Sequence, residues 1–198
     1  IVNAYGAKVT PKGGSADENG VKITGGTISG SAYGADLSDA TSTGTGAKNK
    51  AEMTNGTVSG SLYGAHTAGS GTLSASEVEV SGGSVGGNVY GSDVATGAGD
   101  ATGSKITISG STTSITGDVY GGKTAGTGAA TGHTLNLYGG SVGGSVFGGH
   151  TASGATTGNT VNLGNGTTNA VTTVTGTISG GNGAADTDNV LNVNTNAT

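Results

Sequence analysis

Acidic side chains are the groups in this sequence best suited to chemistry. They form four close pairs: Asp17/Glu18, Asp36/Asp39, Glu77/Glu79 and Asp186/Asp188. Paired carboxylates are the acid, base and nucleophile of glycoside hydrolysis. Glu77 and Glu79 alternate with two valines, so both should point outward from one strand, about 6–7 Å apart at a rise of ~3.3 Å per residue. That separation is at or below the low end of the inverting-glycosidase range. We interpret the pair as a solvated strand face and predict no catalytic residue and no enzyme activity.

A second set of titratable side chains lies three places after a recurring aromatic residue. Its members are Lys8, Asp36, His66, Asp93, Lys123 and His150. If successive repeats stack in register, these residues become neighbours ~4.8 Å apart, and alternating charges avoid repulsion at that spacing. Histidine and carboxylate are also metal ligands, but residues in a straight row do not converge on one ion. We therefore predict a surface charge column, with no metal and no cofactor.

The recurring aromatic residue is followed by glycine and marks a repeat of 27 to 30 residues. The aromatic residues are Tyr5, Tyr33, Tyr63, Tyr90, Tyr120 and Phe147. A regular row of this kind suits either a platform for stacking carbohydrate or a structural ladder in which the rings support one another. We favour the structural ladder.

Apolar residues recur in register with the aromatic column, as expected of stacked coils. One such set is Ile28, Val58, Val85, Ile115, Val142 and Val174. Within one unit, three short strands are predicted, separated by glycine corners. Polar and apolar residues alternate over 134–137, and the two shorter runs are 141–143 and 145–147. No unit can bury its apolar residues alone, whereas stacked units can. The sequence therefore predicts an all-β, right-handed parallel β-helix, a single domain over 1–198 with about seven coils of roughly 27–32 residues.

Composition narrows the class of protein further. The chain has 198 residues with 44 glycines, no cysteine, 10% charged residues and a net charge of −5. A nucleic-acid partner would require a basic patch, so we expect none. No segment is long and apolar enough to insert into a membrane.

The glycine-rich string over 82–91, Gly-Gly-Ser-Val-Gly-Gly-Asn-Val-Tyr-Gly, resembles the repeats of bacterial autotransporter passenger domains. Residues 141–149 and 158–163 fit the same repeat pattern, and the resemblance covers nearly the whole chain. The resemblance implies export, an extracellular or bacterial cell-surface location, and a role as an adhesin or stalk. A host receptor or glycan would be the partner, and the chain would be a segment of a longer passenger. It implies no particular binding residues.

Two other functions fit a β-helix: a glycan-processing lyase or glycosidase, and a self-assembling extracellular fibre subunit. Three or more convergent carboxylates in a groove would favour the enzyme. The expected open sheet edges at both ends would favour the fibre. For the same reason we expect the molecule either to continue beyond both ends or to associate end to end.

Overall fold

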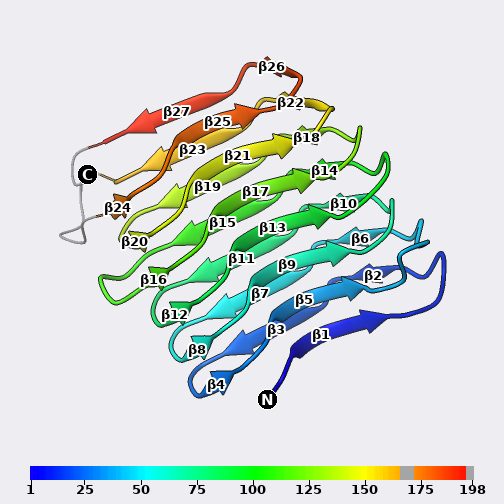
Figure 1. Cartoon of the computed structure of the whole chain (residues 1–198). Helices are drawn as coiled ribbons and strands as arrows, with labels where there is room; N and C mark the ends of the chain where they lie inside the picture. The colour runs from blue at the N-terminus through cyan, green and yellow to red at the C-terminus, as the bar shows by residue number, and fades with distance from the viewer. Residues whose placement is uncertain (166–171, 195–198) are drawn as a thin grey trace.

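The chain forms a parallel β-solenoid of about six turns, close to the seven coils expected (Figure 1). This computed structural model describes residues 1–165 and 172–194. All regular structure in those residues is strand, and no helix there is long and apolar enough to cross a membrane. The all-β parallel fold is therefore confirmed.

The strands lie in four parallel sheets, named A to D in the order in which each coil visits them. Sheet A holds β1 (Ala4–Val9), β5 (Ala32–Leu37), β9 (Leu62–Thr67), β13 (Val89–Val94), β17 (Val119–Thr124), β21 (Val146–Thr151) and β25 (Ile178–Asn182). Sheet B holds β2 (Ala16–Asp17), β6 (Gly46–Ala47), β10 (Leu73–Ser74), β14 (Ala101–Thr102), β18 (Ala130–Thr131), β22 (Ala155–Thr157) and β26 (Ala185–Thr187).

Sheets C and D complete each coil. Sheet C holds β3 (Gly20–Ile23), β7 (Lys50–Met53), β11 (Glu77–Val80), β15 (Lys105–Ile108), β19 (Thr134–Leu137), β23 (Thr160–Leu163) and β27 (Val190–Val193). Sheet D holds β4 (Thr27–Ile28), β8 (Thr57–Val58), β12 (Ser84–Val85), β16 (Ser114–Ile115), β20 (Gly140–Val142) and β24 (Thr172–Val174).

Each coil thus has four strand positions, and the expectation of three was wrong. The missed position is sheet B, whose strands have only two or three residues and lie in the Gly-, Ala- and Thr-rich segments that read as loops. In Figure 1 the near strands of sheet A rise to the right and those of sheet C return behind them to the left, so the coils are right-handed as expected.

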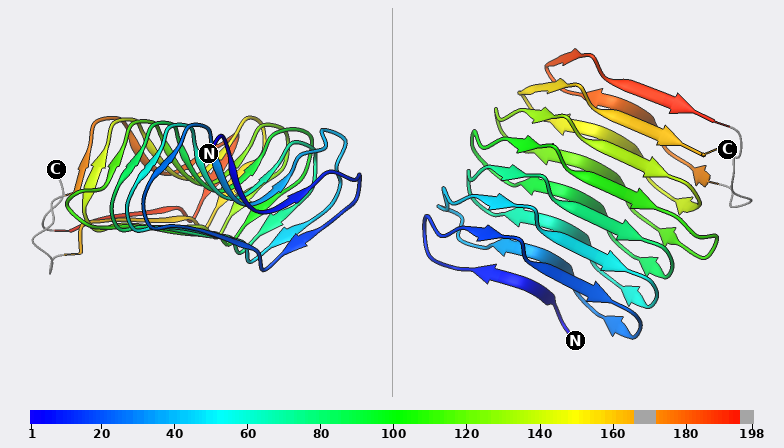
Figure 2. Two further views of the ribbon diagram at one scale, coloured as in Figure 1. Left: turned by 90° about the horizontal axis from the view of Figure 1, so that it is seen from below. Right: turned by 180° about the vertical axis from the view of Figure 1, so that it is seen from behind.

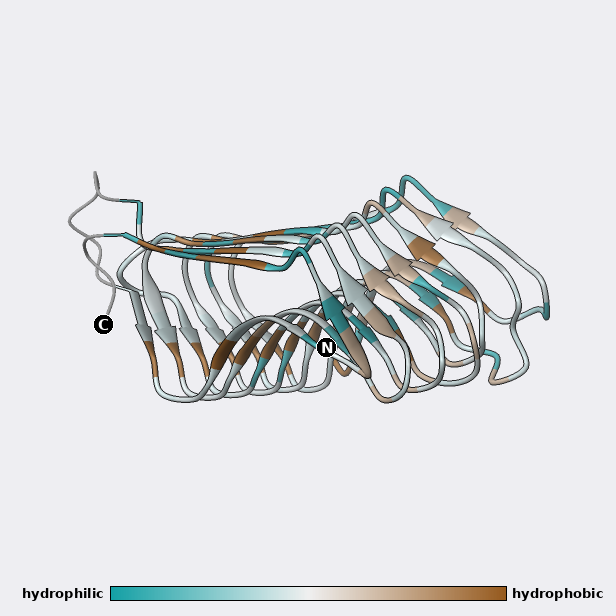
Figure 3. Cartoon of the chain, turned by 90° about the horizontal axis from the view of Figure 1, so that it is seen from above, coloured by the Kyte–Doolittle hydropathy of each residue, from teal (hydrophilic) through white to brown (hydrophobic). Residues whose placement is uncertain are grey.

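The larger hydrophobic core lies between sheets A, C and D. The residues predicted to form one column there, from Ile28 to Val142, pair strand to strand in register. None is more than 6% exposed, so this prediction is confirmed. Figure 3 shows the apolar positions recurring at the same place in successive coils. Two coils carry extra residues between their sheet C and sheet D strands, and the sequence predicts that these insertions bulge outward at this turn. Residues 111–113 lie in the turn between β15 and β16, and most of the other insertion, over 165–171, lies outside the described residues.

A second, smaller core lies between sheets A and B and was not expected. It contains Ala16, Ala35, Leu37, Ala65, Leu73, Val94 and Ala101. In the later coils threonine takes over part of this space. Thr124 and Thr151 are buried there, and each donates its hydroxyl hydrogen to a nearby carbonyl, of Gly128 and Gly154 respectively, both at 2.7 Å.

The glycine of each aromatic-glycine pair lies where the two cores are separated. Seen along the solenoid axis, each coil narrows in its middle (Figure 2). A Cβ on Gly34 would overlap the carbonyl oxygens of Gly64 and Lys50, so sheet A touches the start of sheet C there. The strand pairing of sheet A skips this glycine in every coil. This glycine is needed for close approach and a bend and does not have a positive φ. Glycines between sheets C and D, such as Gly83 and Gly140, do have the positive φ that corners favour.

Candidate functional site: the aromatic and charge columns

The aromatic column is a continuous ring stack on the outer surface of sheet A. Successive centroids from Tyr5 to Phe147 are 5.1, 4.7, 4.8, 5.2 and 5.5 Å apart, with interplanar angles of 4° to 15°. Each inner ring therefore has both faces covered by its neighbours. A sugar stacks on a ring face, so the inner rings have none to offer, and the arrangement supports the structural interpretation.

Polar side chains two residues before the aromatic residues form hydrogen bonds with the tyrosine hydroxyls. Asn88 donates its amide hydrogen to the Tyr90 hydroxyl at 2.7 Å, and the Tyr120 hydroxyl donates to Asp118 at 2.8 Å. The same side chains accept backbone N–H groups from the next coil, as Asn88 does from Asp118 at 2.8 Å. Burial raises the pKa of Tyr63 and of Tyr120, so both stay neutral phenols.

The charge column lies beside the aromatic column on sheet A. Strand pairing places Lys8 against Asp36, Asp36 against His66, and so on through Asp93 and Lys123 to His150. We had expected every member of this column to lie on the surface, but two of them are buried. Asp36 is 5% exposed and Asp93 9%, although Lys8 is exposed.

His66 lies between the two buried aspartates and contacts both. Its Nδ1 is 2.8 Å from Asp36 Oδ1, and its Nε2 is 3.8 Å from Asp93 Oδ2. Burial raises the pKa of Asp93, while the charges of His66 and Lys123 oppose that rise. The imidazole therefore serves as a bridge between two carboxylates. No group of three or more His, Cys, Asp or Glu side chains suited to a metal ion occurs in residues 1–165 and 172–194.

The two columns contact each other because of the glycine bend. Residues three apart on a regular strand point to opposite faces, but the skipped glycine turns both columns outward. The Tyr63 and His66 rings meet edge to face at 5.3 Å, and Lys123 Nζ lies 5.2 Å from the centroid of the Tyr120 ring. Such cation–π and ring contacts stabilise by ~0.5–1 kcal/mol at exposed sites.

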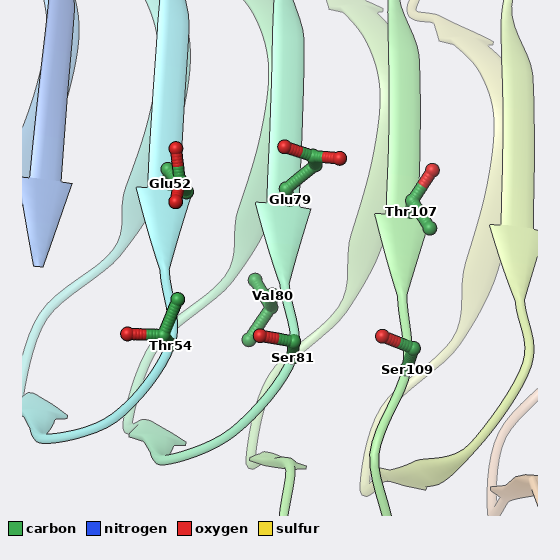
Figure 4. A pocket seen from close by; sticks show the side chains of 7 residues that line it. All are labelled: Glu52, Thr54, Glu79, Val80, Ser81, Thr107 and Ser109. Carbon is green, nitrogen blue, oxygen red and sulfur yellow. The ribbon is translucent and has the colours of Figure 1, made fainter. Parts of the chain in front are cut away.

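The acidic pair Glu77/Glu79 lies on the outer face of sheet C within a network of lysines. Lys50 Nζ is 3.5 Å from Glu77 and also bonds Glu79, and Lys105 lies 3.7 Å from Glu77. Figure 4 shows a shallow hollow next to this network. It is lined by Glu52, Thr54, Glu79, Val80, Ser81, Thr107 and Ser109. Its two carboxylates are both paired, Glu52 with Lys22 at 2.7 Å and Glu79 with Lys50.

The other acidic pairs do not act as pairs. Asp36 bonds His66, whereas Asp39 accepts the backbone N–H of Thr41 at 2.8 Å. Glu18 is ion-paired with Lys48 at 3.1 Å, and Asp17 accepts the backbone N–H of Ala47 at 2.9 Å. Asp17, Glu18 and Asp36 therefore each contact a neighbouring coil, whereas Asp39 bonds within its own turn.

A buried polar column escaped the sequence analysis. The residue immediately before each strand of sheet C is polar: Asn19, Asn49, Ser76, Ser104, His133, Asn159 and Asn189. Asn159 accepts the backbone N–H of His133 at 2.9 Å and donates to the carbonyl of Ala130 at 3.0 Å, which joins it to the preceding coil. The recurrence of a polar residue before every alternating run was the signal that could have found it.

Comparisons of this chain with protein-family models, with curated proteins and with solved structures find no match.

Proposed function

We propose that this chain is a non-enzymatic segment of a secreted or cell-surface protein, a passenger-type shaft that provides mechanical reach or carries an adhesive surface. The observation that carries the proposal is the continuity of its columns. Sheets A, B and C each run through seven strands, and the aromatic stack spans six coils. Interactions repeated from coil to coil give a one-dimensional array whose stability adds up along its length.

The surface favours the same proposal. Most exposed polar residues are threonine, serine and asparagine, which stay neutral at ordinary pH, and most of the carboxylates contact a neighbouring coil. The glycan-processing alternative would have to use Glu52 and Glu79, each of which is already ion-paired with a lysine.

Surface display tests the proposal. The chain would be placed between an outer-membrane anchor and an N-terminal epitope, and intact cells would be probed with antibody and protease. We expect the epitope outside the cell, a protease-resistant shaft, and no new cleavage products from a panel of polysaccharides. Binding of the cells to a glycan array or host cells would indicate an adhesin, and its absence a stalk. Cleavage of a polysaccharide, lost in Glu79→Gln, would establish the enzyme instead.

A further inference from the structure

One position of the buried polar column is occupied by a titratable ring. His133 is fully buried, and its backbone and side chain join three coils. Its Nδ1 accepts the backbone N–H of Ser104 at 3.0 Å, and its Nε2 lies 3.0 Å from the carbonyl oxygen of Ala101. These partners assign the neutral tautomer with the proton on Nε2.

The imidazole reproduces the two bonds that asparagine makes elsewhere in the column. Asn49 accepts the backbone N–H of Asn19 at 3.0 Å and donates to the carbonyl of Ala16 at 2.7 Å. An asparagine amide cannot take up a proton in the ordinary pH range. Histidine can, and a proton on Nδ1 would point at the Ser104 N–H and remove the acceptor of that bond.

The chain makes room for this ring. The sheet A residue that faces the column is Ala35 beside Asn49, Ala65 beside Ser76 and Ser92 beside Ser104. In the last three coils it is glycine: Gly122 beside His133, Gly149 beside Asn159 and Gly181 beside Asn189. A Cβ on Gly122 would overlap the imidazole. Glycine at position 122 therefore leaves the space that the His133 ring occupies.

We propose that His133 is an acid-sensitive joint: its protonation breaks the bond to Ser104 and opens the solenoid between the coils that carry β14 and β18. No other bond along this column depends on a titratable group, so within this column acid acts at this one joint.

The surroundings of His133 offer no counter-charge. His133 bonds the carbonyl of Ala101, and the nearby strand residues Ala101, Ala130 and Leu135 are apolar and fully buried. The nearest lysines point outward, Lys105 toward Glu77 and Lys123 onto the tyrosine stack. Asp186 bonds Thr156 two coils further on. Burial lowers the pKa of His133 to about 4, against a smaller opposing effect of the Ala101 carbonyl.

The sign of the pH dependence follows from linkage. Between pH ~6.5 and ~4 the unfolded chain binds a proton at this histidine and the folded chain does not, so stability is complete above the upper value and falls toward the lower one. A difference of about 2.5 pKa units corresponds to a loss of up to ~300-fold in the local folding equilibrium constant.

The test compares wild type with His133→Asn and with His150→Asn, which alters a partly exposed histidine at a position where the next coil has Asn182. Hydrogen exchange, corrected for intrinsic rates, would be followed from pH 7 to 4. We expect protection at residues 101–104 and 130–134 to fall with pH in wild type and His150→Asn but not in His133→Asn. Carbon-13 NMR should show His133 neutral down to pH ~4.

A joint that is not acid-sensitive gives a different result. Parallel loss of protection in wild type and His133→Asn, or titration of His133 near pH ~6.5, would overturn the proposal. If His133→Asn folds poorly, Gly122→Ala/His133→Asn reproduces the Ala35–Asn49 pair already present in the chain and serves in its place.

Discussion

At the scale of single residues, the side chains that seemed suited to chemistry are used to join coils. Asp36, His66 and Asp93 form a row in which the imidazole contacts both carboxylates. Asp118 accepts hydrogen bonds from the Tyr120 hydroxyl and, at 2.7 Å, from the Ser145 backbone N–H. Bonds between charged groups and backbone amides are worth ~1.5–3 kcal/mol when buried. These contacts select the correct register between coils, because a shift by one residue would separate every partner.

The stacking of the aromatic column predicts how substitutions at Tyr63 change the stability of the protein. Tyr63→Ala should destabilise the protein by about 3 kcal/mol, because it removes a ring stacked on both faces. Tyr63→Phe should cost less than ~1 kcal/mol, since Phe147 already occupies this column. Urea denaturation measures both. A Tyr63→Ala protein as stable as wild type that had lost glycan binding would instead make the column a binding platform.

At the scale of the element, the bend in sheet A depends on glycine at the narrow part of each coil. We predict that Gly64→Ala destabilises the protein by about 1–3 kcal/mol, because the added methyl group would overlap the Gly91 carbonyl oxygen. Gly25→Ala is the matched control: nothing lies within 4 Å of its added Cβ, so the change should be neutral or slightly stabilising. Equal melting temperatures for the two variants would contradict this account of the bend.

The alternation of buried and exposed side chains in sheet D predicts different effects of two neighbouring substitutions on stability. Val142 is 1% exposed and lies between Ile115 and Val174 in the larger core. Val142→Asp should cost roughly 4 kcal/mol or more and unfold at least the adjacent coils, because a carboxylate would be buried without a partner. Ser141→Asp, at the exposed neighbouring position, should change stability by less than ~0.5 kcal/mol. Far-UV circular dichroism during thermal unfolding distinguishes the two.

At the scale of the whole molecule, the 198-residue chain exposes large apolar side chains near both ends. Ile1 and Val2 are 84% and 72% exposed at one end, and Leu191 and Val193 are 42% and 63% exposed at the other. Within residues 1–165 and 172–194, the strand at each end of every sheet, such as β1 and β25 in sheet A, has one unpaired edge. Open edges with exposed apolar side chains favour pairing with another chain.

We therefore predict that the isolated chain associates end to end. Sedimentation velocity should show oligomers that grow with protein concentration, and Leu191→Lys/Val193→Lys should shift them toward monomer because lysine at an edge opposes pairing. A chain that stays monomeric at millimolar concentration would argue against the fibre subunit. In that case the exposed ends would not be sites of self-association.

The sequence alone determined the repeat, the parallel solenoid and the larger core. Those features depend on residues that recur at fixed spacing, and strand periodicity then places Ile28, Val58 and Val85 on one buried face. It also indicated which titratable residues would be neighbours, because stacked coils bring equivalent positions together.

Only the tertiary structure decided where those residues lie relative to solvent and to one another. Sheet B was hidden because a two-residue strand such as β14 carries no detectable alternation. The charge column contacts the tyrosine column because the glycine after each aromatic residue touches sheet C and bends the strand. That contact joins segments distant in sequence, so a local sequence pattern cannot reveal it. The sequence analysis made no prediction for His133, whose role follows from packing against Gly122 and hydrogen bonds to a different coil. Burial and hydrogen bonding depend on three-dimensional neighbours, and these set the chemistry of each side chain.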